Sequence, residues 1–363
     1  MREYVLVCVV AAVFTYLVTP LVRAVAVAVR AFTPVRDRDV HAEPIPRLGG
    51  VAIFLGFVGA SAVAYHLPYL HTAFTTGELK GVLIGGAIVC ALGAVDDIHE
   101  LDWLTKLTGQ VLAAGVLAYQ GVQLLSVPIF GVTVLPRPVL IAITVFIVLA
   151  TANAVNFIDG LDGLAAGLVA IASLAFFAYS YLLARSYDPG SLFTASTFIC
   201  AAVLGCCLGF LPHNFHPARL FMGDAGALLL GLLLAAATIS MTGNVDPSQV
   251  STDQLTATVL PLVAPMAVLL LPFLDLVLSI VRRLRKGMRP WHADAGHLHH
   301  KMMQIGHGHR GAVLILYLWG AVVALGSVSF AYVGRLLAGG VVVGAALVAA
   351  VVTWWVPRRH AGG

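Results

Sequence analysis

The sequence carries very little charge for its length. Lysine, arginine, aspartate and glutamate together make up 10% of the 363 residues, whereas soluble domains carry about 25%. Hydrophobic residues make up 60% of the chain. A core surrounded by water cannot bury that much apolar surface. The composition therefore predicts an integral membrane protein whose solvent is lipid.

Several features that would point to other classes of protein are missing. The five cysteines lie inside apolar segments without metal-ligand spacing, which argues against a disulfide framework and against a metal or redox role. No internal repeat supports a duplicated transporter fold. No long polar linker divides the chain. We therefore expect one integral-membrane domain over residues 1–363 and no nucleic-acid partner.

Apolar segments recur along the whole chain, and a transmembrane helix needs roughly 20 such residues. The first segment is too long for the apolar part of a signal peptide and suits a membrane helix. The stretch 122–137 is too short to span, and its glycine and prolines predict a small hairpin at the outer surface. The expected fold is an all-α polytopic membrane protein with about eleven transmembrane helices, near residues 4–27, 49–67, 80–95, 104–121, 138–153, 163–184, 193–211, 225–242, 256–281, 311–333 and 336–356.

Basic residues predict the orientation, because the cytoplasmic loops of membrane proteins carry an excess of Lys and Arg. With the N-terminus outside and the C-terminus in the cytoplasm, 16 of these residues fall on the inner side and 5 on the outer side. The longest inner loop, 282–310, is basic and rich in histidine. The same orientation places all the polar motifs described next at the cytoplasmic face of the membrane.

Adjacent carboxylates, Asp96 and Asp97, end the third apolar segment. Such a pair repels unless a cation or a proton relieves it. At a lipid–water boundary the obvious cation is Mg²⁺, which takes oxygen ligands and often bridges to substrate phosphates. A solvated helix end is the plainer alternative. Asp224 begins the eighth segment in the string MGDAG, where it is either a further acid of this group or a simple helix cap.

The string NAVNFIDGLDGLAAG follows the fifth segment and contains two acids and two amides. Asp159 and Asp162 are three residues apart, so one helical turn would place both carboxylates on one face. Asn153 and Asn156 supply amides that can orient a sugar, a base or a carboxylate. A polar turn between helices is the alternative, but it would not need so many functional groups.

Histidines gather in the inner loop, in the string GHLHHKMMQIGHGHR. His297, His299 and His300 could bind zinc together. The surrounding basic residues would repel a cation and attract a diphosphate, so phosphate binding is the favoured interpretation. A basic loop that only sets the topology is the plainer alternative. Asp275, inside the ninth segment, is expected to form a structural ion pair.

These four motifs follow one another along the chain as Asp96-Asp97, NAVNFIDGLDGLAAG, MGDAG and GHLHHKMMQIGHGHR. In this order and topology they resemble the polyprenyl-phosphate N-acetylhexosamine-1-phosphate transferase family (glycosyltransferase 4), which includes the WecA, TagO and MraY types and implies a bacterial plasma membrane. The segment PRLGG at 46–50 is similar to the first cytoplasmic motif of the family. The histidine loop looks like the WecA type, and most like actinobacterial enzymes that load GlcNAc-1-phosphate onto decaprenyl phosphate. The resemblance implies that UDP-GlcNAc and a polyprenyl phosphate give polyprenyl-diphosphate-GlcNAc and UMP, as the first membrane step toward an envelope polysaccharide of the arabinogalactan-linker kind. A homodimer is the assembly that the family suggests.

The resemblance also implies roles for single residues. Asp224 is expected to bind Mg²⁺ directly, with Mn²⁺ as the alternative ion. Asp96 and Asp97 are expected to lie beside the metal, where one of them would deprotonate or orient the lipid phosphate. Lys106 would lie near the lipid phosphate, and Arg47 with the histidines would contact the diphosphate and the sugar. The catalytic acids implied are Asp96, Asp97, Asp159 and Asp162, and the substrate-binding residues are Arg47, Lys106, Asn153, Asn156, His297, His299 and His300.

Alternatives remain at this point. An MraY-like enzyme would use UDP-MurNAc-pentapeptide, and a few residues can decide such a choice. A membrane transporter would place acids at mid-bilayer positions along a path, where this sequence has only Asp275. Direct attack by the lipid phosphate is the simpler route, and a covalent aspartyl intermediate is the other.

Overall fold

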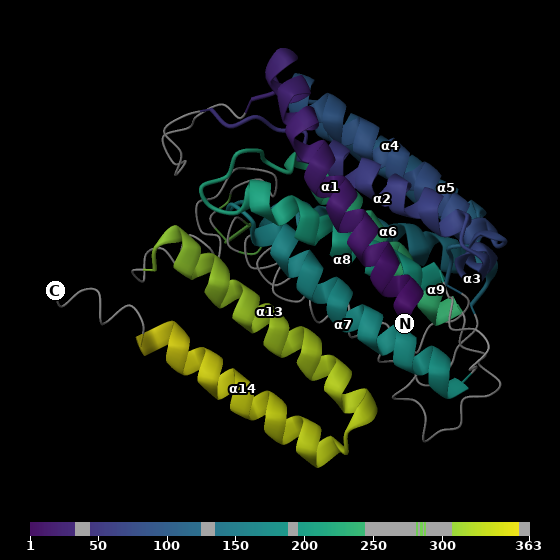
Figure 1. The fold of residues 1–363 in the computed structure, drawn as a ribbon, viewed down its shortest axis with the longest axis vertical. Helices are drawn as coiled ribbons and strands as arrows, with labels where there is room; N and C mark the ends of the chain where they lie inside the picture. The colour runs from purple at the N-terminus through teal and green to yellow at the C-terminus, as the bar shows by residue number, and fades with distance from the viewer. Residues whose placement is uncertain are drawn as a thin grey trace.

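The computed structural model describes residues 1–32, 44–124, 135–187, 195–243 and 307–355, with four more positions between 281 and 287. These parts of the chain are helical, and their one isolated backbone bridge pairs Phe32 with Pro46. The described helices are α1 Arg2–Ala28, α2 Gly49–Tyr65, α3 Pro68–His71, the 3₁₀ helix η1 Thr72–Phe74, α4 Gly77–His99, α5 Trp103–Tyr119, α6 Arg137–Ile158, α7 Leu164–Tyr187, α8 Ala195–Asn214, α9 Gly223–Gly243, α13 His309–Tyr332 and α14 Arg335–Trp355 (Figure 1).

Ten of the eleven predicted segments correspond to these long helices, which confirms an all-α polytopic membrane protein. Eight of the described helices are long and apolar enough to cross a membrane. The predicted segment 256–281 and most of the hairpin 122–137 lie outside the described residues. The short helices α3 and η1 lie between the predicted segments 49–67 and 80–95, outside any predicted helix.

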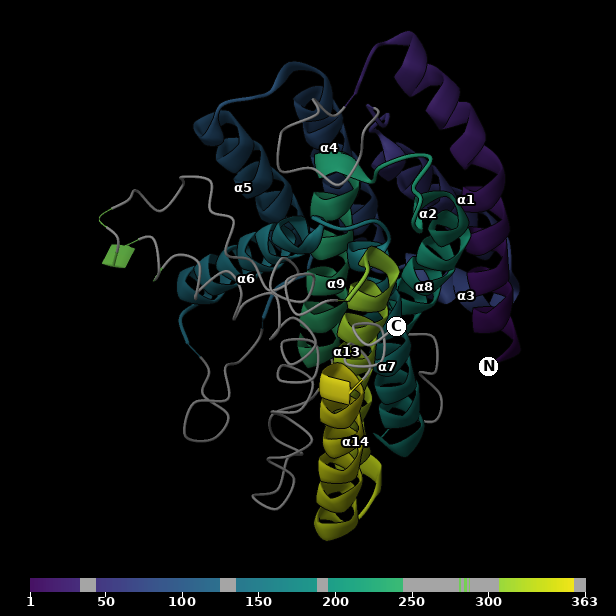
Figure 2. The ribbon, with the colours of Figure 1, turned by 90° about the vertical axis from the view of Figure 1, so that its left-hand side faces the viewer.

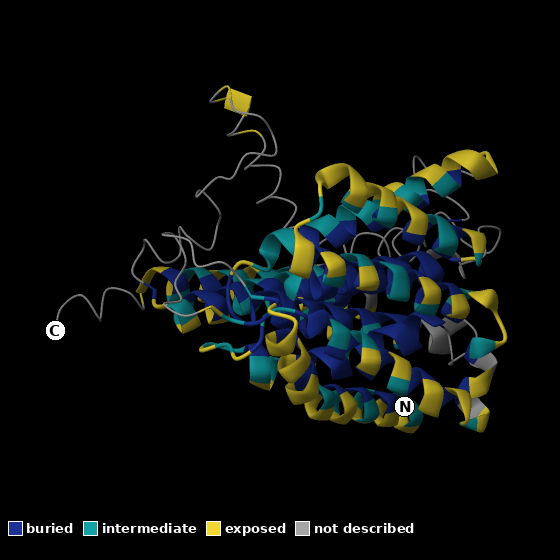
Figure 3. Ribbon diagram, turned by 90° about the horizontal axis from the view of Figure 1, so that it is seen from above, coloured by how far each residue is buried: buried dark blue, intermediate teal, exposed yellow. Residues whose placement is uncertain are grey.

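Helix α9 lies at the centre of the bundle. The apolar 18-residue stretch of α9 is 94% buried inside the protein, whereas the corresponding stretch of α14 is 17% buried. It packs against α4, α6, α8 and α2, and Figure 2 shows it between α6 and α8. Buried residues fill the middle of the bundle, and exposed apolar residues cover its outside, where lipid replaces water as solvent (Figure 3).

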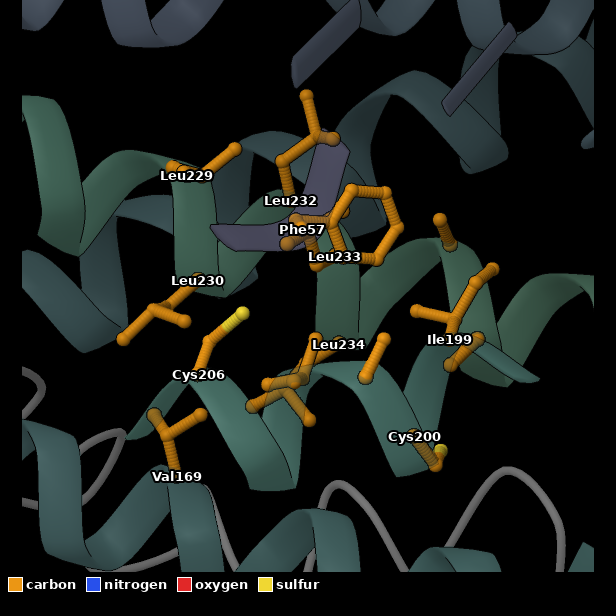
Figure 4. Close-up of a cluster of buried hydrophobic side chains, with 14 of the residues drawn as sticks. Phe57, Val169, Ile199, Cys200, Cys206, Leu229, Leu230, Leu232, Leu233 and Leu234 are labelled. Atoms are coloured by element: carbon orange, nitrogen blue, oxygen red, sulfur yellow. The ribbon is translucent and has the colours of Figure 1, made fainter. Parts of the chain in front are cut away.

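The contact between α8 and α9 is apolar and closely packed. Leu229–Leu234 of α9 meet Phe57 of α2, Val169 of α7, and Ile199 and Cys206 of α8 (Figure 4). All five cysteines are free, and four of them are buried. The expectation that they form no disulfide framework is therefore confirmed.

Two glycines let α2 and α4 approach the start of α9 backbone to backbone. A Cβ atom on Gly50 would lie 2.0 Å from the nitrogen of Gly226, and one on Gly93 would lie 2.3 Å from the nitrogen of Ala225. Any side chain at either position would force these helices apart. This close packing fixes the N-terminus of α9 beside the C-terminus of α4, where the acidic motifs meet.

A short connection joins α4 to α5. Glu100 ends α4 in a left-handed conformation, with φ of 49°. Asp102 then caps α5, because its carboxylate accepts hydrogen bonds from the backbone N–H groups of Leu104 at 2.9 Å and Thr105 at 3.1 Å. This helix–turn–helix connection places Lys106, in the first turn of α5, beside the last turn of α4.

Candidate active site

Four helix ends meet at one end of the bundle, and each contributes a polar side chain. Asp96 comes from the last turn of α4, Lys106 from the first turn of α5, Asn156 from the last turn of α6 and Asp224 from the first turn of α9. Lys106 Nζ lies 2.5 Å from Asp96 Oδ2 and 3.1 Å from Asp224 Oδ2. Asn156 Nδ2 donates to Asp224 Oδ1 at 2.9 Å. The ammonium group thus bridges two carboxylates from separate motifs.

Asp97 has a different environment from its neighbour Asp96. Its side chain has no exposed surface, and its two carboxylate oxygens accept the backbone N–H groups of Asp224 at 3.0 Å and Ala225 at 3.2 Å. These N–H groups are unsatisfied donors at the start of α9, where the helix dipole favours a negative charge. Asp97 therefore acts as an N-cap supplied by another helix, and it fixes the position of Asp224.

Gly223, the residue before Asp224, has a backbone conformation and an absence of side chain that this cap requires. Gly223 has φ of 70°, and a Cβ atom there would lie 2.2 Å from Asp97 Oδ2. Conformation and space both require glycine at this position. The glycine of the MGDAG string is thus explained by the approach of the carboxylate from α4.

Arg47 reaches the same place through the segment 46–50. Backbone hydrogen bonds join this segment to the residues before α9: Phe221 N–H donates to the Pro46 carbonyl at 2.8 Å, and Gly50 N–H donates to the Met222 carbonyl at 2.9 Å. The guanidinium Nη1 of Arg47 lies 4.0 Å from Asp97 Oδ1. Arg47 therefore lies beside the acidic cluster, and its predicted contact with the diphosphate and the sugar stays a prediction.

Asp159 follows the last residue of α6 and faces the same acids. Burial, together with the negative charges of Asp224 and Asp97, raises the pKa of its carboxyl to about 7, and the positive charge of Arg47 partly offsets these effects. Around this point the described residues place four carboxylates against the cations Lys106 and Arg47. The donor set is all oxygen and carries an excess of negative charge, which fits a hard divalent cation such as Mg²⁺.

Asp162 points away from this cluster. We expected one helical turn to place Asp159 and Asp162 on one face, but residues 159–163 form a non-helical turn between α6 and α7. Asp162 Oδ2 instead accepts from His216 Nδ1 at 2.8 Å and from the Ala218 N–H at 3.1 Å. The expectation of a shared face was wrong because the turn reverses the chain direction between the two acids.

The two asparagines also differ. Both lie on α6, which runs five residues beyond the predicted end at 153. Asn156 contacts Asp224, whereas Asn153 Nδ2 donates to Gln110 Oε1 at 2.6 Å and to the Leu149 carbonyl at 2.8 Å. Asn153 thus joins α6 to α5 one turn deeper in the bundle. Sequence reasoning missed Gln110, although it lies one turn after Lys106 on the same face of α5.

An open cleft of about 820 Å³ adjoins Asp97. Its wall includes the cationic side chains of Arg30 and Arg47 and the ring of His99. Positive charge beside an acidic cluster suits a substrate that carries phosphates. His297, His299, His300 and Asp275 lie outside the described residues, so their predicted roles stay predictions.

The fold and this site define a multi-pass membrane protein with a lysine-bridged acidic centre at one end of its helix bundle. Residues 79–242, which carry that centre from α4 to α9, match the model of glycosyl transferase family 4. The chain belongs to this family of polyprenyl-phosphate N-acetylhexosamine-1-phosphate transferases. Family membership shows that the protein is a transferase. It thereby excludes the membrane transporter, the alternative that remained after the sequence was considered alone.

Two mycobacterial relatives cover nearly the whole chain, and both are named decaprenyl-phosphate N-acetylglucosaminephosphotransferase. The Mycobacterium leprae protein is 42% identical over 358 residues, which are 97% of this chain and 90% of the relative. The Mycobacterium tuberculosis protein is 43% identical over 359 residues, 97% and 89% of the two chains. A phospho-N-acetylmuramoyl-pentapeptide-transferase of Desulforudis audaxviator is 36% identical over 245 residues, 61% of this chain and 70% of the relative.

Proposed function

We propose that the protein transfers GlcNAc-1-phosphate from UDP-GlcNAc to a polyprenyl phosphate, with decaprenyl phosphate as the acceptor. The products are polyprenyl-diphosphate-GlcNAc and UMP. The observation that carries this proposal is the bridge of Lys106 between Asp96 and Asp224, at a site where helix ends from several motifs converge. The names of the two mycobacterial relatives support the choice of sugar and lipid.

The reaction needs groups that let two anions approach each other. The phosphate oxygen of the lipid attacks the β-phosphorus of UDP-GlcNAc, a new P–O–P bond forms, and the bond to the bridging oxygen of UMP breaks. Lys106 would offset the charge of the lipid phosphate, and Arg47 that of the diphosphate. Asp96 would orient the acceptor phosphate or remove its proton, because its carboxylate already contacts Lys106.

A divalent cation fits the same centre. Asp224, with Asp96 and Asp159 nearby, would hold Mg²⁺ or Mn²⁺, and the ion would offset phosphate charge in the transition state. Asp97 is not assigned as a ligand, because both of its oxygens accept backbone N–H groups of α9. Its role in the proposed reaction is to position Asp224. Asn156 would orient the other oxygen of Asp224.

We place the site at the cytoplasmic face of the plasma membrane. The distribution of Lys and Arg supports this orientation, and a nucleotide sugar is a cytoplasmic substrate. The product would be the first lipid-linked sugar for an envelope polysaccharide of the arabinogalactan-linker kind, and a homodimer is the proposed assembly. The nucleotide sugar is expected to contact the turn 159–163 and the histidine loop.

Release of UMP by the purified protein tests the proposal. The detergent-solubilised protein is given Mg²⁺ and decaprenyl phosphate, with UDP-GlcNAc or UDP-MurNAc-pentapeptide offered separately. We expect UMP with UDP-GlcNAc alone, and loss of the reaction on chelation. Activity with the pentapeptide alone would move the protein to the branch of the Desulforudis relative, which is the second candidate function. A folded sample that uses neither donor would contradict the proposal.

A further inference from the structure

The turn between α6 and α7 is held on the side away from the acidic centre by two histidines that the proposed reaction does not use. His216, in the connection between α8 and α9, donates from Nδ1 to Asp162 Oδ2 at 2.8 Å. His309, the first residue of α13, accepts the backbone N–H of Asp162 at Nε2, at 3.1 Å. Residue Asp162 is 3% exposed, so both contacts form in a water-poor environment.

One carboxylate and two histidines could suggest a transition-metal site, since ligand atoms of Asp162, His216 and His309 lie within 4.8 Å of one another. The ring geometry argues against it. The two imidazoles stack with centroids 4.2 Å apart and planes tilted by 20°, so their lone pairs lie in separate, nearly parallel planes, an arrangement that does not favour binding of one ion by both rings. The near nitrogen of each ring is already engaged with Asp162. The cluster is therefore a hydrogen-bonded clamp.

More contacts from the same two regions hold the end of the turn. Asn214 Oδ1 accepts the Gly163 N–H at 3.1 Å, and the hydroxyl of Tyr317 on α13 donates to the Gly163 carbonyl. Arg310 Nε donates to the His216 carbonyl at 3.0 Å, which joins the two sides of the clamp. Helix α13 thus reaches the turn through two side chains two turns apart.

The opposite end of this turn carries Asp159, which lies near enough to Asp224 and Asp97 for their charges to act on its carboxyl group. Only Gly160 and Leu161 separate Asp159 from the clamped Asp162. A shift of the clamped end would therefore move the acid at the other end. Catalytic groups lose efficiency when they are displaced by about 1 Å.

We propose that His309 is a positioning residue for the transfer reaction: its Nε2 accepts the Asp162 N–H and fixes the turn that places Asp159 in the acidic centre. This inference rests on the proposed function for its kinetic readout. It gives α13, which packs on α7 at the edge of the bundle (Figure 1), a role in positioning the acidic centre.

The proposal requires an acceptor at the position of Nε2 and no other property of the ring. An accepting Nε2 carries no proton, so this hydrogen bond requires the neutral tautomer of His309 with its proton on Nδ1. Glutamine places an amide oxygen near the position of Nε2, whereas asparagine reaches only to that of Nδ1. His309→Gln and His309→Asn therefore differ in reach and keep the same functional group.

The kinetic test compares these variants in the detergent-solubilised full chain with saturating UDP-GlcNAc and decaprenyl phosphate. We expect His309→Asn to lower kcat by about ten- to a hundredfold, with the KM for decaprenyl phosphate changed less than about twofold. His309→Gln is expected to keep kcat within about threefold. The matched control is His307→Asn, because His307 Nε2 contacts the Thr353 carbonyl of α14 and not the turn; its kcat is expected to stay within about twofold.

Hydrogen exchange of the peptide covering 159–164 gives a second readout that needs no activity. His309→Asn should exchange faster there, and His309→Gln and His307→Asn should match the wild type. A folded His309→Asn enzyme with wild-type kinetics and exchange would overturn the proposal. So would equal losses in His309→Gln, or an equal loss in His307→Asn. If the wild type releases no UMP from either donor, the proposed function fails, and the exchange result alone decides whether His309 holds the turn.

Discussion

Helices α4 and α9 run side by side through the bundle, and carboxylates that are buried or part-buried join them at both ends. At one end, called the outer end because it lies away from the acidic centre, Glu78 of α4 accepts a hydrogen bond from the hydroxyl of Ser240 on α9. At the inner end, roughly 27 Å of helix away, the carboxylates of α4 and α9 meet Lys106. At the outer end, one acid with a hydroxyl partner joins the two helices. At the inner end, several acids surround one lysine, so their negative charge exceeds its positive charge and favours the binding of a further cation. Burial of a carboxylate alone therefore does not mark the active site.

The largest expected effect is that of Asp224→Asn. The amide keeps the size of the side chain but removes the charge that would hold the metal and face Lys106. We expect UMP release to fall about a thousandfold, with an unchanged elution volume in size-exclusion chromatography as the folding control. A folded variant that keeps more than about a tenth of the wild-type rate would remove Asp224 from the metal site.

Lys106→Gln should have the next largest effect. Glutamine can still hydrogen-bond Asp96 or Asp224, but the positive charge between them is lost. We expect kcat/KM for the lipid phosphate to fall about a hundredfold. Lys106→Arg is the matched control, because it keeps the charge and should retain more activity than glutamine. Equal losses in both variants would show that shape, not charge, is what the site requires of Lys106.

Asp97→Asn tests the cap that separates Asp97 from Asp96. An asparagine oxygen can accept only one of the two N–H groups at the start of α9, and its NH₂ group faces the other. The loss of a cap costs about 1 kcal/mol, with a range of about 0.5–2. Asp97→Asn is therefore expected to lower the thermal unfolding midpoint as well as the rate, whereas Asp224→Asn lowers the rate alone. An unshifted midpoint in Asp97→Asn would contradict the role of Asp97 as a cap.

Composition and motif order predicted much of this molecule. Apolar segments of membrane length predicted ten described helices, because lipid forces the backbone to satisfy its own hydrogen bonds. The four strings predicted that Asp96, Lys106, Asn156 and Asp224 share one site, since helix ends on one face of a membrane are near one another.

The particular partners could not be read from the sequence. Asp96 and Asp97 are adjacent, yet one contacts Lys106 and the other caps α9, because successive residues on a helix point in directions about 100° apart. Asp159 and Asp162 diverge because the turn between them is not helical. Their partners come from far along the chain: His309 lies 147 residues after Asp162, and no spacing rule predicts such a contact.

Glu78→Gln has the smallest expected effect and gives the comparison of the two helix ends its sharpest test. The amide oxygen can still accept the hydroxyl of Ser240, so we expect activity within about twofold of the wild type. Glu78→Ala, which removes the hydrogen bond, should cost about 1 kcal/mol of stability and leave the rate intact. A carboxylate-to-amide change would then abolish activity at the inner end of the α4–α9 pair and leave it unchanged at the outer end. A tenfold loss in folded Glu78→Gln would instead show that the outer end takes part in the reaction, and the distinction between a structural and a catalytic carboxylate would fail for this pair.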